Sequence, residues 1–382
     1  MTDQHAFLAP SAAHRWVQCP ASPKMEALHP EPEDSPESME GTAAHWVNQM
    51  TLAGTPPAID SATPNGVIVT GEMLEGAELV VEAVDQMLGA AGRAYLVVEQ
   101  RVAIPRVHAQ NWGTPDYRAW TRAPDNRLVL NMLDYKFGHG IVEAFENWQL
   151  IDYVAGCLSE AGITGLADQN VIVDMCVIQP RSFHKDGPVR HWRVLASDLR
   201  GHINRLAMAA EDATSADPGC SPAPAACKHC LARHACTALQ RTAYMASDLA
   251  YKAESLDMTP QHLGLELRML YRARDLLNAR ISGQEAQAVS HITVGKRQVP
   301  WWAMEATSGR RGWIRPAAEV IALGNLMGVN LAKDPDVITP TQARKAGLLD
   351  SLVDAYSHVP PGTAKLVPDD GAKARRVFTK EV

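Results

Sequence analysis

The feature that most constrains this chain is a short apolar segment that ends in charged residues. Residues 128–133 read Leu-Val-Leu-Asn-Met-Leu, the length of a β-strand, and Asp134, Tyr135 and Lys136 follow. Because side chains alternate along a strand, Asp134 and Lys136 project from the same face. The segment therefore predicts a sheet with a polar site at the edge where this strand ends.

A second acid lies upstream of this strand. Asp116 ends the segment Trp-Gly-Thr-Pro-Asp at residues 112–116. Two carboxylates from adjacent strands, converging at one sheet edge, make an oxygen site suited to Mg²⁺ or Mn²⁺. Lys136 can reach a water or phosphate at such a metal, and metal-activated hydrolysis of a phosphodiester needs these parts.

A pair of polar residues follows on the next expected helix, residues 144–161. Gln149 and Tyr153 stand four residues apart and project to the same side. With the two acids and the lysine, this pair resembles the PD-(D/E)xK nuclease superfamily, specifically its RecB-like branch. That branch includes the AddB nuclease and the CRISPR-associated RecB-like exonucleases. The resemblance implies an α/β fold with a restriction-endonuclease-like core, a mixed sheet flanked by helices.

The segment Glu40-Gly-Thr-x-x-His45 resembles the first motif of RecB-like nucleases. The resemblance implies that His45 faces the metal, and neutral imidazole is a reasonable ligand for a Mn²⁺-tolerant site. The implied metal ligands are His45, Asp116, Asp134 and the carbonyl of Tyr135.

The resemblance implies a set of catalytic residues and a role for each. The set is Asp116, Asp134, Lys136, Gln149 and Tyr153. Lys136 would orient or deprotonate the attacking water and steady the phosphate. Gln149 and Tyr153 would support the site and hold the DNA backbone.

The cysteines give a second strong signal. Cys227, Cys230 and Cys236 have the spacing of metal ligands, which leaves a fourth ligand to find. Zn²⁺ with Cys220, His229 or His234 as the fourth ligand is one interpretation, and a cysteine group that holds no metal is a second.

The resemblance to the AddB-type iron–sulfur staple implies another. A [4Fe–4S] cluster would be held by Cys19, Cys227, Cys230 and Cys236. It would join two ends of the nuclease domain across about 200 residues and so stabilise mainly by restricting the unfolded chain.

Hydrophobic periodicity predicts the remaining elements. Helices are expected at residues 71–92 and 144–161, and strands at residues 95–104, 114–121, 128–136 and 171–179. A mobile loop is expected at residues 29–40. Thr259 and Pro260 predict the start of a helix that runs to about residue 289, and residues 291–299 read as a further strand.

We therefore expect two domains: a nuclease domain at residues 1–240 and a mainly helical C-terminal appendage at residues 241–382. Residues 1–100 carry 3 Lys/Arg against 14 Asp/Glu, whereas residues 262–315 carry 9 against 4. Arg310, Arg311 and Trp313 lie in this basic stretch and could bind single-stranded DNA. A hairpin packed on the nuclease domain explains them equally well. The opening Arg15-Trp-Val-Gln-Cys19-Pro-Ala-Ser, the Thr339-Pro340-Thr-Gln-Ala segment and the ending that starts at Val359 resemble a phage-associated, largely uncharacterised RecB-like family, so this resemblance covers nearly the whole chain.

Composition and the N-terminal sequence indicate the cellular compartment. Hydrophobic residues make up 46% of the chain, typical of a globular protein, and no apolar run approaches the ~20 residues that span a bilayer. The N-terminus lacks the pattern of a signal peptide. We expect a cytoplasmic protein without membrane segments, in which the seven cysteines are not a disulfide framework.

The leading hypothesis is a metal-dependent DNA nuclease, an exonuclease acting on the ends of linear duplex or single-stranded DNA in phage recombination or repair. Its partner would be a phage recombination protein such as a single-strand-annealing or binding protein. The main alternative is a non-catalytic, iron–sulfur-stapled module for DNA binding or assembly. An RNA substrate is a third option.

Overall fold

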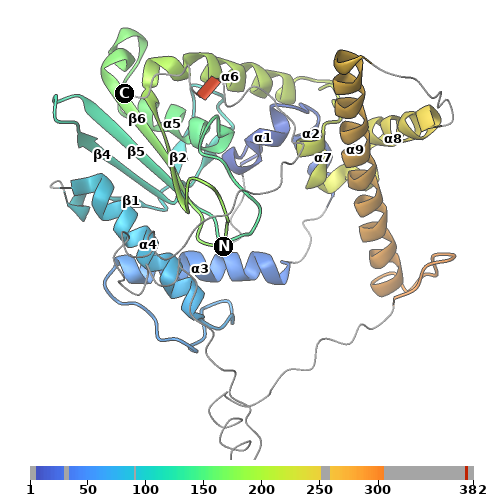
Figure 1. The fold of residues 1–382 in the computed structure, drawn as a ribbon, viewed down its shortest axis with the longest axis horizontal. Coiled ribbons are helices and arrows are strands. Elements are labelled where there is room, and N and C mark those ends of the chain that lie inside the picture. Colours follow the sequence, from blue (N-terminus) through green and yellow to red (C-terminus); the bar gives the residue numbers. More distant parts are fainter. Residues whose placement is uncertain (1–5, 30–33, 90–91, 251–258, 305–374, 377–382) are drawn as a thin grey trace, which may run out of the picture. The chain divides into compact units, whose positions relative to one another are not determined.

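A computed structural model gives the fold (Figure 1). The structure describes residues 6–29, 34–89, 92–250, 259–304 and 375–376. Residues 1–295 with 370–382 form one compact unit, and residues 296–369 form a second. Arg310, Arg311 and Trp313 lie outside the described residues, so their role in DNA binding stays a prediction. The domain division at residue 241 also stays a prediction.

A mixed five-stranded sheet organises the first unit. Its strands, in spatial order, are β1 (Val97–Val98), β4 (Tyr117–Arg122), β5 (Leu128–Tyr135), β6 (Val171–Ile178) and β7 (Val189–Leu195). Only β5 and β6 pair in parallel, and the other neighbours are antiparallel. A separate two-stranded sheet contains β2 (Val102–Ala103) and β3 (Trp112–Gly113).

Helices make up most of the rest of the described residues. The α-helices are α1 (Ala13–Trp16), α2 (Ser22–Glu26), α3 (Pro36–Leu52), α4 (Gly71–Leu88), α5 (Trp148–Glu160), α6 (Arg200–Thr214), α7 (Pro224–Lys228), α8 (Thr237–Ala250) and α9 (Pro260–Thr293). The short 3₁₀ helices are η1 (Pro10–Ala12), η3 (Arg93–Tyr95), η4 (Gly165–Asn170), η5 (Ala196–Leu199) and η6 (Leu231–His234).

The alternation along β5 divides the core between two faces of the sheet. Leu130 and Met132 pack into a cluster with α1, α5 and α6. Leu133 and Tyr135 point the other way, into a cluster with α3 and α4. Figure 1 shows these helices in separate layers beside the sheet. The predicted α/β class is confirmed: a mixed sheet lies between helices, and a helical region follows it in the chain.

Helix α5 makes the crossover that a parallel pair of strands requires, from the end of β5 to the start of β6. Asn147 caps its first turn, because its side-chain oxygen accepts hydrogen bonds from the N–H groups of Gln149 at 3.0 Å and Leu150 at 3.3 Å. The cap places the first turn of α5 beside the end of β5. The polar site lies there.

The expected strand at residues 95–104 is wrong. The chain breaks between β1 and β2, which pair in different sheets. Glu99 lies at the break with φ of 43°, a backbone conformation outside the β region, and its N–H donates to the carbonyl of Asp116 at 3.0 Å. Alternating hydrophobicity could not show this bend, because it carries no information about the sign of the φ angle at a residue.

Two other boundaries differ from expectation. Helix α9 continues through Thr293, so residues 291–293 are helical and the strand predicted at 291–299 is wrong. Its start is confirmed, because the side chain of Thr259 accepts from the N–H of His262. Helix α3 begins at Pro36, inside the expected loop, because Ser35 caps it and proline is favourable at the first helical position.

No helix in the described ranges is long and apolar enough to cross a membrane.

Gly156 tests the contact between α5 and the small sheet. A Cβ at this position would lie 2.9 Å from Cγ1 of Ile104 and 3.0 Å from the carbonyl oxygen of Ala103. We expect Gly156→Ala to lower the free energy of unfolding by about 1–2 kcal/mol, since overpacking outweighs the gain in helix propensity. Gly201→Ala, on α6 with open space around its Cα, is the matched control and should leave stability unchanged or slightly raised. Urea denaturation of both variants checks this, and equal stability would contradict the tight packing.

Candidate functional site

The two predicted carboxylates meet at the end of β5. Asp116 precedes β4, the antiparallel neighbour of β5. Its Oδ2 accepts a hydrogen bond of 2.7 Å from the backbone N–H of Tyr135. This bond joins Asp116 to the peptide between Asp134 and Tyr135, so the sheet fixes one acid beside the other.

Asp134 is the buried centre of the site, with its side chain 3% exposed. Its Oδ1 accepts from Nζ of Lys136 at 3.1 Å and from Nε2 of Gln149 at 3.1 Å. Nζ of Lys136 also lies 3.3 Å from Oε1 of Gln149. In contrast, Oδ2 of Asp134 is buried without a hydrogen-bond partner among the described residues. Buried carboxylate oxygens normally accept at least one hydrogen bond or bind a cation, so this oxygen lacks the partner that its burial calls for.

The charges at the site favour a bound cation. Burial raises the pKa of Asp116 to about 6; His45 opposes this shift, and the nearby Asp134 carboxylate adds to it. Burial alone would lower the pKa of Lys136, but Asp134 and Asp116 raise it, so the lysine carries its charge. One ammonium group faces two clustered carboxylates, and a divalent ion would stabilise both in ionised form.

His45 reaches the same site from α3. Its Nδ1 lies 3.8 Å from Oδ1 of Asp116, and its ring meets the ring of Tyr135 edge-on at 5.4 Å between centroids. The predicted set of His45, Asp116 and Asp134 is therefore brought together. As the side chains stand, no three or more His, Cys, Asp or Glu residues in the described part form a group that could hold a metal ion.

Arg181 fixes α3 in place and was not foreseen from the sequence. It makes two hydrogen bonds of 2.7 Å to Glu40 and one of 2.9 Å to Glu72. Its guanidinium also lies 3.8 Å from the ring centre of Phe137. Glu40 begins the Glu-Gly-Thr motif five residues before His45 on α3, so this fork of hydrogen bonds helps to set the position of that helix.

Tyr153 acts inside the protein. It is 5% exposed, and its hydroxyl donates to the carbonyl of Thr114 at 3.3 Å. Gly113 leaves no room for a side chain, because a Cβ there would lie 2.7 Å from the tyrosine ring. The tyrosine thus supports the turn that leads into Asp116. Its contact with DNA stays a prediction.

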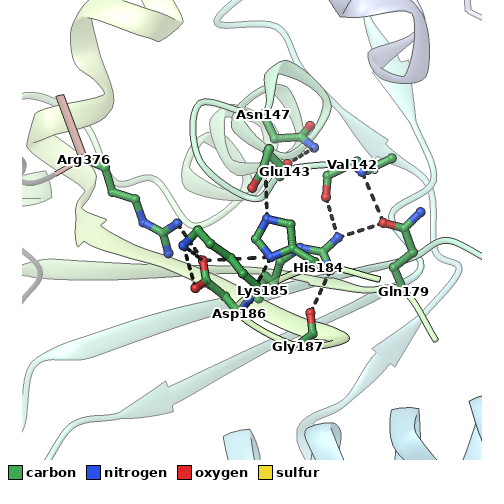
Figure 2. A network of polar contacts seen from close by, with 10 residues as sticks. Val142, Glu143, Asn147, Gln179, His184, Lys185, Asp186, Gly187 and Arg376 are labelled. Carbon is green, nitrogen blue, oxygen red and sulfur yellow. Dashed lines mark hydrogen bonds and ion pairs between the residues drawn. The ribbon is translucent and has the colours of Figure 1, made fainter. Parts of the chain in front are cut away.

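Gln179 is a second residue of the site region whose role was not foreseen from the sequence. It directly follows β6 and is fully buried, and its side chain bonds to the loop that follows Lys136. Figure 2 shows Gln179 facing Val142 of that loop. A glutamine directly after an unbroken apolar strand was the available signal, since a buried amide needs partners for all its hydrogen-bonding groups.

The predicted cysteines gather in a second site. The pocket there is lined by Cys19, Cys220, Cys227, Cys230 and Cys236 together with Met25 and Arg233 among others. The backbone N–H of Ser221 lies 3.4 Å from Sγ of Cys19, and that of Leu239 lies 3.4 Å from Sγ of Cys236. The N-terminal and C-terminal cysteine segments are therefore side by side, although about 200 residues separate them in the chain.

Burial keeps several of these thiols protonated in the absence of a metal. It raises the pKa of Cys19 and Cys227, that of Cys220 to about 11 and that of Cys230 to about 12.

The alternative histidine ligands are placed elsewhere. Neither His229 nor His234 is among the residues found to line the cysteine pocket. Nδ1 of His234 lies 3.0 Å from the carbonyl of Leu231, and its ring packs edge-on against His29. Cys220 is the alternative fourth ligand that the pocket does contain.

The model of a family described as protein of unknown function (DUF2800) matches residues 5–374.

A buried acid behind the site provides a test of its packing. Both carboxylate oxygens of Asp152 on α5 lie 2.9 Å from Nδ2 of Asn111, and burial raises the pKa of Asp152 to about 8. Oδ1 of Asn111 is buried without a partner among the described residues.

We expect the folding stability to fall by up to about 1.4 kcal/mol per pH unit between about pH 4 and pH 8, because the folded state holds the Asp152 proton more tightly than the unfolded state. Asp152→Asn removes this component, since an amide can both donate to and accept from Asn111. Denaturant unfolding at about pH 5 and pH 8 should show a smaller loss for the variant. Asp198→Asn, at an exposed acid, is the control and should keep the wild-type pH dependence. A wild-type slope retained in Asp152→Asn would contradict the assignment.

Proposed function

The chain belongs to the DUF2800 family, and we propose that it is a metal-dependent DNA nuclease with a restriction-endonuclease-like core. We propose further that it is an exonuclease that acts on DNA ends in phage recombination or repair. A cytoplasmic location, where thiols stay reduced, is part of this proposal.

The convergence at the end of β5 carries the proposal. Four separate segments contact one another here through their functional groups. Helix α3 supplies His45, and the turn before β4 supplies Asp116. The end of β5 supplies Asp134 and the adjacent Lys136, and α5 supplies Gln149. An unpartnered carboxylate oxygen lies in the middle. Leaving part of a buried charge unpaired is costly, and a cation bound at this oxygen would remove that cost.

The donor set fits a hard divalent ion. Asp116 and Asp134 would hold Mg²⁺ or Mn²⁺, with His45 and the Tyr135 carbonyl as further ligands. When bound, the ion supplies Lewis acidity toward the phosphodiester. Lys136, charged and already in contact with Asp134, orients the water and offsets charge on the phosphate. Gln149 holds Asp134 and Lys136 in register, and Tyr153 supports the turn before Asp116.

We also propose that Cys19, Cys227, Cys230 and Cys236 hold a [4Fe–4S] cluster. The support is the shared pocket of these four thiols and the absence of His229 and His234 from its described lining. The cluster would fasten the segment around α1 and α2 to α7 and α8, so its role is structural.

We expect Asp134→Asn and Lys136→Ala to reduce cleavage of linear DNA by about a thousandfold or more, because each removes a group in contact with the reacting phosphate or its metal. The measurement is digestion of 5′- and 3′-labelled linear duplex and single-stranded DNA with Mn²⁺, which also gives the polarity. EDTA should stop the wild-type reaction.

Asp174→Asn is the matched control. This carboxylate lies on β6, in the same sheet, and pairs with His191 at 2.9 Å rather than with the site. It should cut at the wild-type rate. Full activity in purified Asp134→Asn would sink the assignment. A wild-type protein that binds DNA without cutting it would favour the non-catalytic binding or assembly module.

We expect Cys19→Ala and Cys227→Ala to lose bound iron and lower the thermal midpoint of an anaerobic preparation. Iron and sulfide content, the visible absorption spectrum and thermal unfolding are the measurements. Cys157→Ala, at a buried core cysteine on α5, is the control for losing a thiol outside the pocket and should retain iron. A colourless, zinc-containing protein would replace the cluster with a zinc site and leave the nuclease proposal intact.

A further inference from the structure

The loop that follows Lys136 is held by two buried side chains, Gln179 and Arg190, and Arg190 donates to the carbonyl of Val142 at 2.7 Å. Nε2 of Gln179 donates to the carbonyls of Gly138 at 2.9 Å and Gly140 at 2.6 Å. Its Oε1 accepts from the N–H of Val142 at 3.2 Å and from Arg190 at 2.8 Å. Figure 2 shows the contact with Val142. Three of the four hydrogen bonds of this amide therefore fix residues 138–142, and the fourth joins it to Arg190.

This clamp determines which way the neighbouring N–H groups point. In a trans peptide the carbonyl and the following N–H lie on opposite sides, and no peptide bond in the described part is cis. Since the carbonyls of Gly138 and Gly140 point to the buried Gln179, the N–H groups of His139 and Ile141 point away from it. Both residues are exposed, and neither N–H has a hydrogen-bond partner among the described residues.

The surroundings leave space for a ligand. Gly138 and Gly140 are exposed, and a Cβ on either would meet nothing within 4 Å. The loop begins two residues after Lys136, whose ammonium group is in the site. It also lies close to the start of α3: the pKa of Glu40 is lowered mainly by Arg181 and in smaller part by His139. The two free N–H groups therefore lie at the rim of the proposed active site.

We propose that the N–H groups of His139 and Ile141 bind a phosphate of the substrate's backbone, next to the phosphate that is cleaved. Paired backbone N–H groups form concave sites for anions, and short glycine-containing loops allow a phosphate to approach the chain closely. Gln179 is the positioning residue, because it holds both carbonyls inward. The proposal rests on the nuclease function and adds a substrate contact to it.

Substituting proline or alanine at position 141 separates the effect of losing the N–H group from the effect of losing the side chain. Ile141→Pro removes the donor, whereas Ile141→Ala shortens the side chain and keeps it. The assay is fluorescence anisotropy of labelled linear DNA with Ca²⁺ in place of Mg²⁺, which reads binding rather than cleavage. We expect Ile141→Pro to bind roughly tenfold to a hundredfold more weakly, as for the loss of a hydrogen bond to a charged group. Ile141→Ala should bind like the wild type.

A charge pair gives a second test that does not alter the backbone. His139→Asp places a carboxylate beside the two N–H groups and should weaken binding at least tenfold relative to the isosteric His139→Asn. Asn126→Asp adds the same charge in the turn between β4 and β5, at the opposite end of β5. It should bind like the wild type.

The outcomes separate this inference from the proposed function. If the wild type binds and cuts DNA while proline matches alanine at position 141 and aspartate matches asparagine at position 139, the phosphate contact is wrong and the nuclease stands. If the wild type neither binds nor cuts linear DNA, the nuclease proposal fails and this contact fails with it.

Discussion

The burial of Asp134 is the constraint on which the rest of the site depends. A carboxylate nearly removed from water is costly unless positive charge and hydrogen bonds surround it. Here Lys136 and Gln149 share one of its oxygens, and the other remains without a partner among the described residues. The protein thus holds an acid in a state that is incompletely compensated. Such a state is unfavourable for stability alone, but it suits a group that binds a cation.

The geometry of the sheet explains why this carboxylate can be held so firmly. Hydrogen bonding to both neighbouring strands fixes β5, and the backbone N–H of Tyr135 holds Asp116 at a set distance from Asp134. The parallel pairing of β5 with β6 brings the residues that follow both strands to the same edge. Gln179 and Arg181, just after β6, therefore reach the loop beyond Lys136 and the start of α3. A three-residue segment after one strand positions two other parts of the site.

The cysteine segments show the same principle at longer range. The carbonyl of Gly219 accepts from the N–H of Ala21 at 3.2 Å, and Oε1 of Glu26 accepts from the N–H of Leu231 at 2.9 Å. These contacts bring the N-terminal helices against the cysteine-rich segment. A cluster in the pocket would then reinforce an arrangement that hydrogen bonds already favour. It would stabilise the fold chiefly by limiting the freedom of the unfolded chain.

The sequence by itself determined the elements with strong periodicity and the polar residues at their ends. The strand at β5 and the N-cap at Thr259 follow from alternation and local capping, which are properties of neighbouring residues. The grouping of Asp116 with Asp134 was expected because each lies at the end of one of two adjacent predicted strands. Only the tertiary structure decided the rest. The bend at Glu99 depends on a hydrogen bond to Asp116, and the roles of Gln179 and Arg181 depend on loops that meet them across the sheet. The burial of Tyr153 likewise depends on its contact with the turn at Thr114, which is distant in the chain. Contacts between residues far apart in the chain leave no periodic trace, because each is fixed by packing and not by its neighbours in sequence.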